Sequence, residues 1–356
     1  MNRIVNRKQS TVNSEQPNQN QLLLSTFFVV LFTVCCLLTQ MSLPLVIINP
    51  ASAGGATGDA WPGIASELRT HFGAFRPAFT SKPAEAIEIA AEAARKGTKL
   101  IIACGGDGTI SEVANGILSS GCDSELGILP SGTGGDFRRS IRIPTRTRDA
   151  AIILREGQTR RIDVGRASYA TDTVEQETRY FLGVASFGMS ADVIALVKAG
   201  KPEWLPAKAP RWLSGRVSFA VAMLQSAARM KPTRVIVQLD DKAAQRTTVA
   251  NLCIANAQYF GGGMKIAPLA KLTDGKFDVV SIGDLGFTRI LSNAPRLYLG
   301  AHLSMSEVQH ALATKITASP IDKNERIGLD LDGELPGFLP ATFQIVARAL
   351  RIRCPR

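Results

Sequence analysis

The chain has 356 residues, of which 45% are hydrophobic and 20% are charged, so it is neither disordered nor fibrous. Its length favours two domains over one. Lysine and arginine outnumber aspartate and glutamate by 41 to 30, and the net charge of +11 favours acidic lipid, nucleotide or nucleic acid as partners, although a well-solvated basic surface gives the same balance.

Cysteine and histidine usage restricts the chemistry. The six cysteines include no CxxC pair and no histidine at metal-ligand spacing, which predicts a reduced, cytoplasmic protein. Only three histidines occur, so a histidine general base or a histidine-rich metal site is not expected.

The N-terminal extension, residues 1–40, is polar and basic at its tip and apolar from residue 22 to residue 39. The apolar run is long enough to be a candidate membrane span or signal anchor. A span with its positive flank in the cytoplasm would place the rest of the chain outside the cell. A non-spanning anchor and a true start at Met41 are the other interpretations, and we favour these two.

Residues 41–158 alternate buried strands with helices, which predicts an α/β domain with a parallel sheet. Strands are expected at 45–49, 99–104 and 125–130. Helices are expected at 59–72, at 81–97 with Ser81 as its cap, and at 109–118. Two of the strands run directly into glycine-rich turns, which is where open α/β sheets bind ligands.

Residues 159–345 have a β-rich pattern and predict a second, all-β domain, followed by a terminal strand at 346–356 that could return to the first domain. Strands are expected at 161–168, 179–186, 233–240, 247–257, 276–284, 325–334 and 341–352. One helical or irregular insert is expected, at about residues 190–231.

The clearest motif is the glycine-rich turn GGDGT at residues 105–109, between a predicted strand and a predicted helix. Successive glycines let the backbone approach a ligand, and the amides at the helix start can face phosphate oxygens. Asp107 suits such a site if it acts through a metal ion or a ribose hydroxyl. An ordinary tight turn is the alternative.

A second glycine-rich turn, residues 130–136, follows the neighbouring strand and ends in Asp136. Two such turns side by side predict a phosphate cradle of backbone amides, with Asp107 and Asp136 placed to bind Mg²⁺ or to organise its waters. Neither turn has the GK[ST] ending of a P-loop, and no GxGxxG occurs where a dinucleotide-binding fold requires it.

The third motif is acidic: Asp330, Asp332 and Glu334 alternate in the segment GLDLDGELPG. Along a strand their side chains would point to one face, which is costly unless they meet a metal, a cation or water. One of them could be the general base that takes a proton from an attacking hydroxyl. A solvated acidic turn is the alternative.

In order and spacing, these motifs resemble the diacylglycerol kinase catalytic-domain family, which includes bacterial soluble lipid kinases and sphingosine and ceramide kinases. The resemblance covers about residues 43–354 and rests on NPxS (49–52), GGDGTxxEVxNG (105–116), PxGTGGD (130–136), RIDVG (161–165) and LDGE (331–334). It implies an α/β N-terminal domain of the NAD kinase/diacylglycerol kinase type, a C-terminal β-sandwich, and ATP with Mg²⁺ in the cleft between them.

The resemblance also implies roles for individual residues. ATP contacts are implied at Asn49, Thr80, Gly105, Gly106, Asp107, Gly108, Thr109, Ile110, Ser111, Glu112, Gly132 and Thr133. Asp107, Asp136 and Asp163 correspond to the aspartates of the Mg²⁺–water network, and Asp332 to the catalytic base, with Glu334 beside it. Asp274, in the turn KLTDGK, corresponds to a structural Mg²⁺ ligand helped by the carbonyls of Lys271 and Lys276.

Three positions depart from the family pattern. Gly135 and Ser111 stand where many members have asparagine, and Ala53 stands where a glycine follows the NPxS serine. The first two changes alter groups near the phosphates but leave every carboxylate in place.

The insert at about 190–231 is the candidate lipid-contacting segment, because it mixes bulky apolar residues with bases. Its main residues are Trp204, Trp212, Phe219, Met223, Lys198, Lys201, Lys208, Arg211, Arg216, Arg229 and Lys231. An amphipathic helix pair packed on the sandwich explains the apolar residues equally well.

The expected function is therefore transfer of the γ-phosphate of ATP to a lipid hydroxyl, with a diacylglycerol-like acceptor, at an anionic membrane surface. The expected location is cytoplasmic and peripheral to the membrane, with an N-terminal anchor still open. An NAD kinase and a catalytically silent nucleotide- or lipid-binding regulator are the alternatives. Nucleic acid is not expected as a partner, and an edge strand of the sandwich could pair two chains.

Overall fold

The computed structural model describes residues 43–132, 134–174, 176–199, 221–222, 225–226, 232–283 and 287–356. Leu43–Arg356 form one unit, separate from Met1–Ser42. Residues 1–40, Thr133 and most of the 190–231 insert lie outside the described residues, so the interpretations given for them stay predictions. Within the described ranges, no helix is long and apolar enough to cross a membrane.

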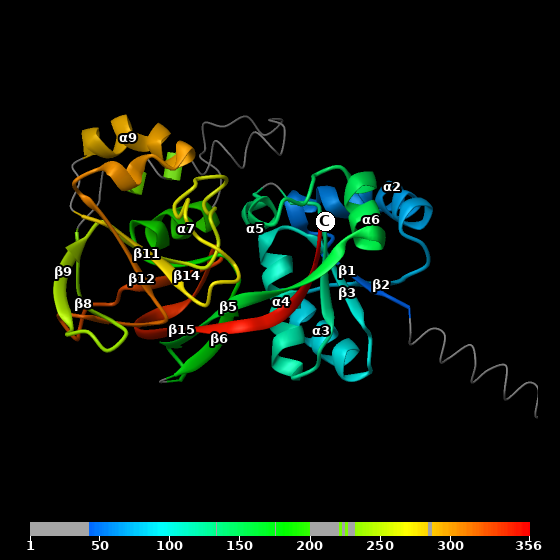
Figure 1. Ribbon diagram of the computed structural model, residues 1–356, viewed down its shortest axis with the longest axis horizontal. Helices are drawn as coiled ribbons and strands as arrows, with labels where there is room; N and C mark the ends of the chain where they lie inside the picture. The colour runs from blue at the N-terminus through cyan, green and yellow to red at the C-terminus, as the bar shows by residue number, and fades with distance from the viewer. Residues whose placement is uncertain are drawn as a thin grey trace, which may run out of the picture. The chain divides into compact units, whose positions relative to one another are not determined.

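A parallel four-stranded sheet forms the first half of this unit (Figure 1). Its strands, in spatial order, are β2 (Arg76–Phe79), β1 (Leu45–Ile48), β3 (Leu100–Gly105) and β4 (Glu125–Pro130). The helices are α2 (Ala56–His71), α3 (Glu85–Arg95), α4 (Asp107–Ser120), α5 (Asp136–Ser140) and α6 (Thr147–Glu156), with a short 3-10 turn, η1, at Ser52–Gly55. The central strands β1 and β3 are buried throughout, as continuous apolar runs in a parallel sheet should be.

The structure corrects three details of this half. β2 was not predicted, because its sequence RPAF is short and contains a proline, which only an edge strand tolerates. Helix α4 begins at Asp107, inside the glycine-rich motif rather than after it. Ser81 does not cap α3: its N–H and hydroxyl both donate to the carboxylate of Glu85, and Ala84 occupies the cap position.

The second half is a β-sandwich built almost entirely from antiparallel pairs. Its shorter strands are β6 (Glu177–Phe181), β7 (Val184–Gly188), β8 (Thr233–Leu239), β9 (Gln245–Val249), β10 (Asn251–Ala255), β11 (Phe277–Ile282), β12 (Val308–Ala313), β13 (Lys315–Pro320) and β14 (Gly328–Leu331). Its core includes stacked Phe181 and Phe277, with Phe343 edge-on to Phe181. The predicted fold class, an α/β domain followed by a β-sandwich, is confirmed.

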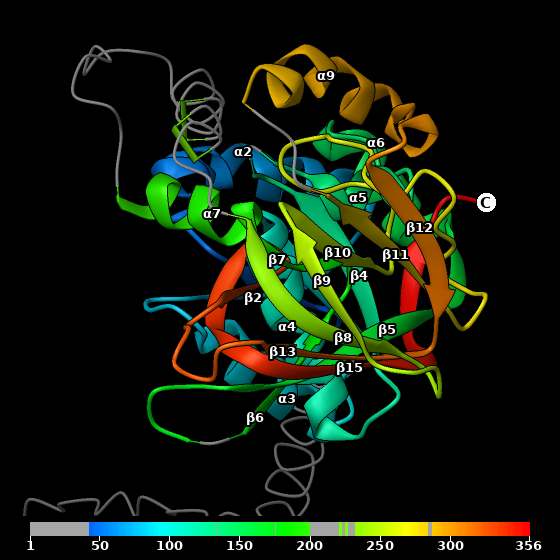
Figure 2. The ribbon, with the colours of Figure 1, turned by 90° about the vertical axis from the view of Figure 1, so that its left-hand side faces the viewer.

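Helices α7 (Met189–Ala199) and α9 (Phe287–Leu299), both within the described ranges, pack on the sandwich. α7 lies in the predicted insert, whereas α9 was not predicted; a 3-10 turn, η2 (His302–Ser304), follows it. Both views place α9 across one end of the sandwich (Figure 2).

Two long strands, β5 (Gln158–Ala170) and β15 (Glu334–Cys354), run side by side between the halves (Figure 1). β15 leaves the sandwich and pairs in parallel with β4 at Arg351 and Ile352. The predicted terminal strand 346–356 is therefore the end of β15 rather than a strand of its own. The register of β15 shifts between Val346 and Leu350, and Arg348 within this bulge has φ of +51°.

Candidate active site

The two glycine-rich turns lie against each other at the carboxyl ends of β3 and β4. The Ser131 amide donates to the Gly105 carbonyl at 2.9 Å. A Cβ added to Gly132 would lie 2.4 Å from the Gly106 Cα, so only glycine allows this approach. The turns therefore form one continuous backbone surface.

The NPxS turn joins the same surface through hydroxyl contacts. The Asn49 amide donates to the Thr109 hydroxyl at 3.2 Å, and the Ser52 hydroxyl lies 3.4 Å from the same oxygen. Thr57 at the start of α2 donates to the Ser131 carbonyl at 2.7 Å. Three segments far apart in sequence thus surround the N-terminus of α4, whose first-turn amides have no acceptors within the helix.

Asp107 points towards the second turn. Its carboxylate accepts the amides of Gly135 at 2.7 Å, Asp136 at 3.1 Å and Phe137 at 3.2 Å. The amides of Gly135, Asp136 and Phe137 therefore hold Asp107 and are not available to a phosphate group. The amides at the start of α4 have no acceptors within the helix and can face phosphate oxygens, and the rest of the predicted phosphate cradle stays a prediction.

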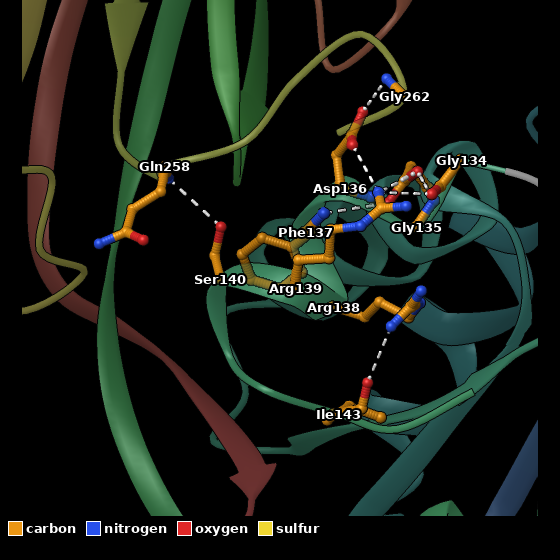
Figure 3. A network of polar contacts seen from close by, with 11 residues as sticks. Gly134, Gly135, Asp136, Phe137, Arg138, Arg139, Ser140, Ile143, Gln258 and Gly262 are labelled. Atoms are coloured by element: carbon orange, nitrogen blue, oxygen red, sulfur yellow. Dashed lines mark hydrogen bonds and ion pairs between the residues drawn. The ribbon is translucent and has the colours of Figure 1, made fainter. Parts of the chain in front are cut away.

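Asp136 lies next to Asp107, at the first position of α5 (Figure 3). Its carboxylate binds the Arg139 guanidinium at 2.8 Å and accepts the Gly262 amide at 2.8 Å. Burial, followed by the negative charge of Asp107, raises the pKa of Asp136 to about 6. Two carboxylates that repel each other in a partly buried place, with oxygen donors only, fit a divalent cation such as Mg²⁺.

The other two predicted metal ligands lie elsewhere. Asp163, fully buried in β5, accepts the amides of Arg348 and Gly275 at 2.7 Å each, and so satisfies the bulge of β15. Asp274 is exposed and accepts the Lys276 amide at 3.2 Å. Across the described residues, no group of three or more Asp, Glu, His or Cys side chains is arranged to hold a metal ion. Metal roles for Asp163 and Asp274 stay predictions.

The acidic motif is a tight hairpin turn rather than a strand. β14 ends at Leu331, Leu331 pairs with Glu334, and Asp332 and Gly333 both have positive φ, +51° and +88°. This is the two-residue turn that Asp-Gly favours. The expected alternation of three carboxylates along one strand is therefore wrong, because the chain reverses between them.

The turn aims Asp332 at the start of β7. Its carboxylate accepts the amides of Leu182 and Gly183, both at 2.8 Å, and of Val184 at 3.2 Å. Burial raises the pKa of Asp332, although these three amides favour the charged form. The carboxylate is thus fixed in orientation, and Asp332 is one of the residues that line a cavity.

Asp330 lies behind it, almost wholly buried at 3% exposure. It accepts the Ser186 hydroxyl at 2.7 Å and the Gly333 amide at 2.8 Å, and Ser186 in turn lies 2.8 Å from the Ser190 hydroxyl. Burial, with smaller contributions from the charges of Asp332 and Glu334, raises the pKa of Asp330 to about 7. The charges of Asp330, Asp332 and Glu334 therefore still affect one another, although the three side chains do not alternate along one strand.

Glu334 connects the sandwich to the glycine-rich turns. A Cβ added to Gly108 would lie 3.6 Å from a carboxylate oxygen of Glu334, which places this side chain at the start of α4. Burial raises the pKa of Glu112, and Glu334 adds to the increase, while Glu112 accepts the Ala84 amide at 3.2 Å. Glu112 thus binds the backbone at the start of α3. The sequence predicted only an ATP contact for this residue.

The remaining predicted ATP contacts divide into two groups. Asn49 and Thr109 belong to the backbone surface described above, and Thr80 follows β2 with its amide bound to the Ile48 carbonyl at 2.9 Å. Ile110 and Ser111 instead line the cavity. Contacts with ATP stay predictions for all of them.

The cavity itself has a volume of about 210 Å³ and lies where the two halves meet. Four aspartates line it: Asp107, Asp136, Asp330 and Asp332. Most of the other lining residues are apolar and come from α7, α9, the β7 region and the 259–266 segment, including Leu182, Val184, Met189, Val193, Ile194, Phe260, Met264, Ile266 and Leu297. Among the described residues that line it, none is lysine or arginine.

Several residues of the site were not identified from the sequence. Ser190 and Asn251 line the cavity, and the side-chain oxygen Oδ1 of Asn251 accepts the Ser190 backbone amide at 3.0 Å. Asn115, noted only as a motif position, exchanges two hydrogen bonds of 2.9 Å with the Tyr180 backbone and so holds α4 against β6. The motif GGDGTxxEVxNG could have suggested Asn115. Nothing in the local sequence marks Ser190, in α7, or Asn251, in the apolar strand β10, as site residues.

Two family descriptions match the chain. Residues 44–167 match the diacylglycerol kinase catalytic domain, and residues 186–354 match the YegS C-terminal NAD kinase beta sandwich-like domain. The chain is 30% identical to a diacylglycerol kinase of Mycobacterium tuberculosis over 315 residues, covering 87% of this chain and 94% of the relative. It is also 30% identical to a diacylglycerol kinase of Bacillus subtilis over 278 residues, covering 78% and 84%.

A solved structure shares the fold. It is the crystal structure of a diacylglycerol kinase from Bacillus anthracis, which aligns with a TM-score of 0.62 at 20% identity over 88% of this chain and 97% of that chain.

The two-domain fold and the site between its halves define a phosphotransferase of the lipid kinase class. The chain belongs to the diacylglycerol kinase family, as the resemblance of its motifs predicted.

Proposed function

We propose that this lipid kinase transfers the γ-phosphate of ATP to the hydroxyl of a neutral, diacylglycerol-like lipid. The observation that carries the proposal is the cavity, which is lined mainly by apolar residues together with four aspartates. Apolar walls suit acyl chains, and a few convergent polar groups suit one hydroxyl at the reacting position.

The phosphates of ATP would lie on the backbone surface formed by the two glycine-rich turns and the start of α4. Asp107 and Asp136 would hold Mg²⁺, which would neutralise negative charge on the phosphates when bound. A site with two carboxylates suits Mg²⁺, because this ion is usually bound by one or two carboxylates together with substrate phosphates. The protein's contribution is mainly to position the reactants.

Asp332 is the proton acceptor in this proposal. Three amide donors fix its carboxylate, and Asp332 lines the cavity in which the lipid hydroxyl would lie. Asp330 lies nearby and accepts the Ser186 hydroxyl, which in turn lies beside the Ser190 hydroxyl. A fixed base beside the attacking hydroxyl lowers the barrier for transfer.

The charge of the cavity disfavours an anionic acceptor. With four aspartates and no lining lysine or arginine among the described residues, the cavity would repel the pyrophosphate of NAD. The relatives named above are diacylglycerol kinases, and this supports the same acceptor class here. We propose that the protein meets its lipid at an anionic membrane surface on the cytoplasmic side, consistent with its net charge of +11.

The test is transfer of labelled phosphate from ATP with Mg²⁺ to diacylglycerol, a sphingoid base, a long-chain alcohol and NAD, each supplied separately, with the lipids in neutral mixed micelles. The proposal expects diacylglycerol to be the best acceptor and NAD to be inactive. Labelled NADP would overturn it in favour of an NAD kinase. Better transfer to the sphingoid base would retain the lipid kinase but reject the neutral acceptor.

A further inference from the structure

A second hollow of about 320 Å³ lies outside the candidate active site. Its walls come from four places in the chain: the segment after α5 (Ser140–Arg142), the start of β5, the end of β15, and the 257–273 segment of the sandwich half. The hollow is therefore shared by both halves of the molecule.

The lining of this hollow is basic. Arg142, Arg160 and Lys271 line it with exposed side chains, and no aspartate or glutamate is among its lining residues in the described part of the chain. Arg356 also lines it, and its guanidinium donates to the Glu156 carbonyl at 3.0 Å. The side chains of Arg142, Arg160 and Lys271 make no such hydrogen bond within the described residues.

These three cations have no strong internal partners. No hydrogen bond or ion pair within the described residues joins Arg142, Arg160 or Lys271 to a carboxylate; Lys271 interacts only at longer range with Asp278, whose carboxylate is bound to His310. Arg142 also has φ of +59°, a conformation that costs free energy for a residue with a side chain. Three cations around one hollow repel each other unless an anion lies between them.

Polar groups that can donate to an oxygen complete the wall. The hydroxyls of Ser140 and Thr273 line it beside the cations, whereas the side-chain amide of Gln258, which also lines it, already donates to the carbonyls of Pro268 and Ala270. The Gln258 amide donates to the Ser140 hydroxyl at 3.2 Å, which links the end of α5 to the sandwich half (Figure 3). The first residue of the same short helix is Asp136 in the candidate active site.

We propose that this hollow is a binding site for a phosphate group, carried either by a small soluble anion or by a lipid headgroup. Arg142 and Arg160 supply planar guanidinium groups, which bind phosphate oxygens in pairs, and Lys271 adds a third charge. Because the walls come from both halves, the bound anion holds the end of α5 against the sandwich. The proposal is independent of which lipid the active site phosphorylates.

The test is calorimetric titration of the full chain with inorganic phosphate at constant ionic strength, in the wild type and in the double variant Arg142→Gln, Arg160→Gln. Each lost charge-assisted hydrogen bond weakens binding by about tenfold, so the variant should bind phosphate at least about tenfold more weakly. The matched control is Arg246→Gln, Lys323→Gln, which removes two exposed charges outside the hollow. It should change the affinity by less than about twofold.

The second arm measures co-sedimentation with phosphatidylcholine vesicles that either contain or lack phosphatidylglycerol. If the affinity for inorganic phosphate measured by calorimetry depends on Arg142 and Arg160, a soluble phosphate is supported as the source. Binding that depends on these arginines only with the anionic vesicles supports a lipid headgroup. If neither assay distinguishes the hollow variant from the control variant, the proposal is overturned. Neither arm requires kinase activity, so failure of the proposed lipid kinase reaction would leave the result interpretable.

Discussion

Asp330 and Asp332 are separated by one residue, but their carboxylates have different surroundings. Both line the cavity, but Asp332 is held by three backbone amides, whereas Asp330 is bound to the Ser186 hydroxyl and the Gly333 amide. Burial raises the pKa of both side chains, to about 7 for Asp330. Asp330 therefore makes the native state sensitive to pH in a range where most carboxylates remain charged.

We expect Asp330→Asn to increase stability at pH 8. The native state binds the Asp330 proton more tightly than the unfolded state, so the free energy of unfolding falls as pH rises from about 4 to about 7. Asparagine removes this decrease in the free energy of unfolding, which amounts to at most about 4 kcal/mol. Urea unfolding of the wild type and of Asp330→Asn from pH 4 to pH 8 measures the difference.

The control for this comparison is Asp241→Asn, at an exposed position of the sandwich half. It should leave the pH dependence of the free energy of unfolding unchanged. A difference between Asp330→Asn and the wild type that stays constant from pH 4 to pH 8 would contradict the assignment of the pH effect to Asp330.

At this scale, the sequence identified the residues that have strong local patterns. Asp107, Asp136 and Asp332 each lie in a glycine-containing turn, and the structure brings all three to one cavity. Asp163 lies in a motif too, but its carboxylate binds the backbone of β15. Ser186 was not predicted as a site residue, because its contact with Asp330 depends on the pairing of β7 with β14, which no local sequence pattern indicates.

The two glycine-rich turns act as one element, because their backbones touch at Gly106 and Gly132. We expect Gly132→Ala to force the turns apart, since its Cβ would lie 2.4 Å from the Gly106 Cα. The cost should be about 1–3 kcal/mol of stability, as for other overpacked sites. ATP affinity should fall as well, and isothermal titration with ATP and Mg²⁺ measures this.

Gly63→Ala is the matched control. Gly63 lies within α2, with no atom within 4 Å of an added Cβ, so alanine should raise the free energy of unfolding by about 0.5–1 kcal/mol and leave ATP affinity unchanged. Equal ATP affinity in Gly132→Ala and Gly63→Ala would show that the contact between the turns does not shape the nucleotide site.

Elements with a continuous apolar pattern were predicted closely, and β4 matches its predicted range of residues 125–130. β2 and α9 were missed for local reasons, since both contain a proline inside the element, Pro77 and Pro295. The hairpin at Asp332 was interpreted first as a strand, with an acidic turn as the alternative, because the three acids alternate. The Asp332-Gly333 pair, which favours a two-residue hairpin turn, was the signal that could have distinguished them.

The whole molecule is joined across its two halves by buried polar contacts as well as by β5 and β15. Asn115 is the clearest example, with a side chain that is 6% exposed and fully used by the Tyr180 backbone and the Ser111 carbonyl. Asn115→Ala would leave the Tyr180 amide and carbonyl without partners. We expect a loss of about 1–3 kcal/mol in the free energy of unfolding.

Denaturant unfolding measures this loss, with Asn324→Ala in an exposed turn as the control. The control should change stability by less than about 0.5 kcal/mol. Equal effects of the two substitutions would show that α4 and β6 are held together by other contacts. The sequence did not predict this joint, because it depends on an α-helix and a β-strand that lie 65 residues apart along the chain.

The central claim is that Asp332 accepts the proton when phosphate passes to a lipid hydroxyl. Asparagine suits the same turn, because Asn-Gly and Asp-Gly favour the same backbone conformation, so Asp332→Asn should keep the fold while removing the base. The decisive measurement is the rate of labelled phosphate transfer from ATP to diacylglycerol in the wild type, Asp332→Asn and the control Asp241→Asn. Circular dichroism and ATP binding serve as checks on folding. We predict a loss of about 10²–10⁴-fold in kcat for Asp332→Asn alone, with ATP affinity retained. A folded Asp332→Asn protein that transfers phosphate within about tenfold of the wild-type rate would contradict the account.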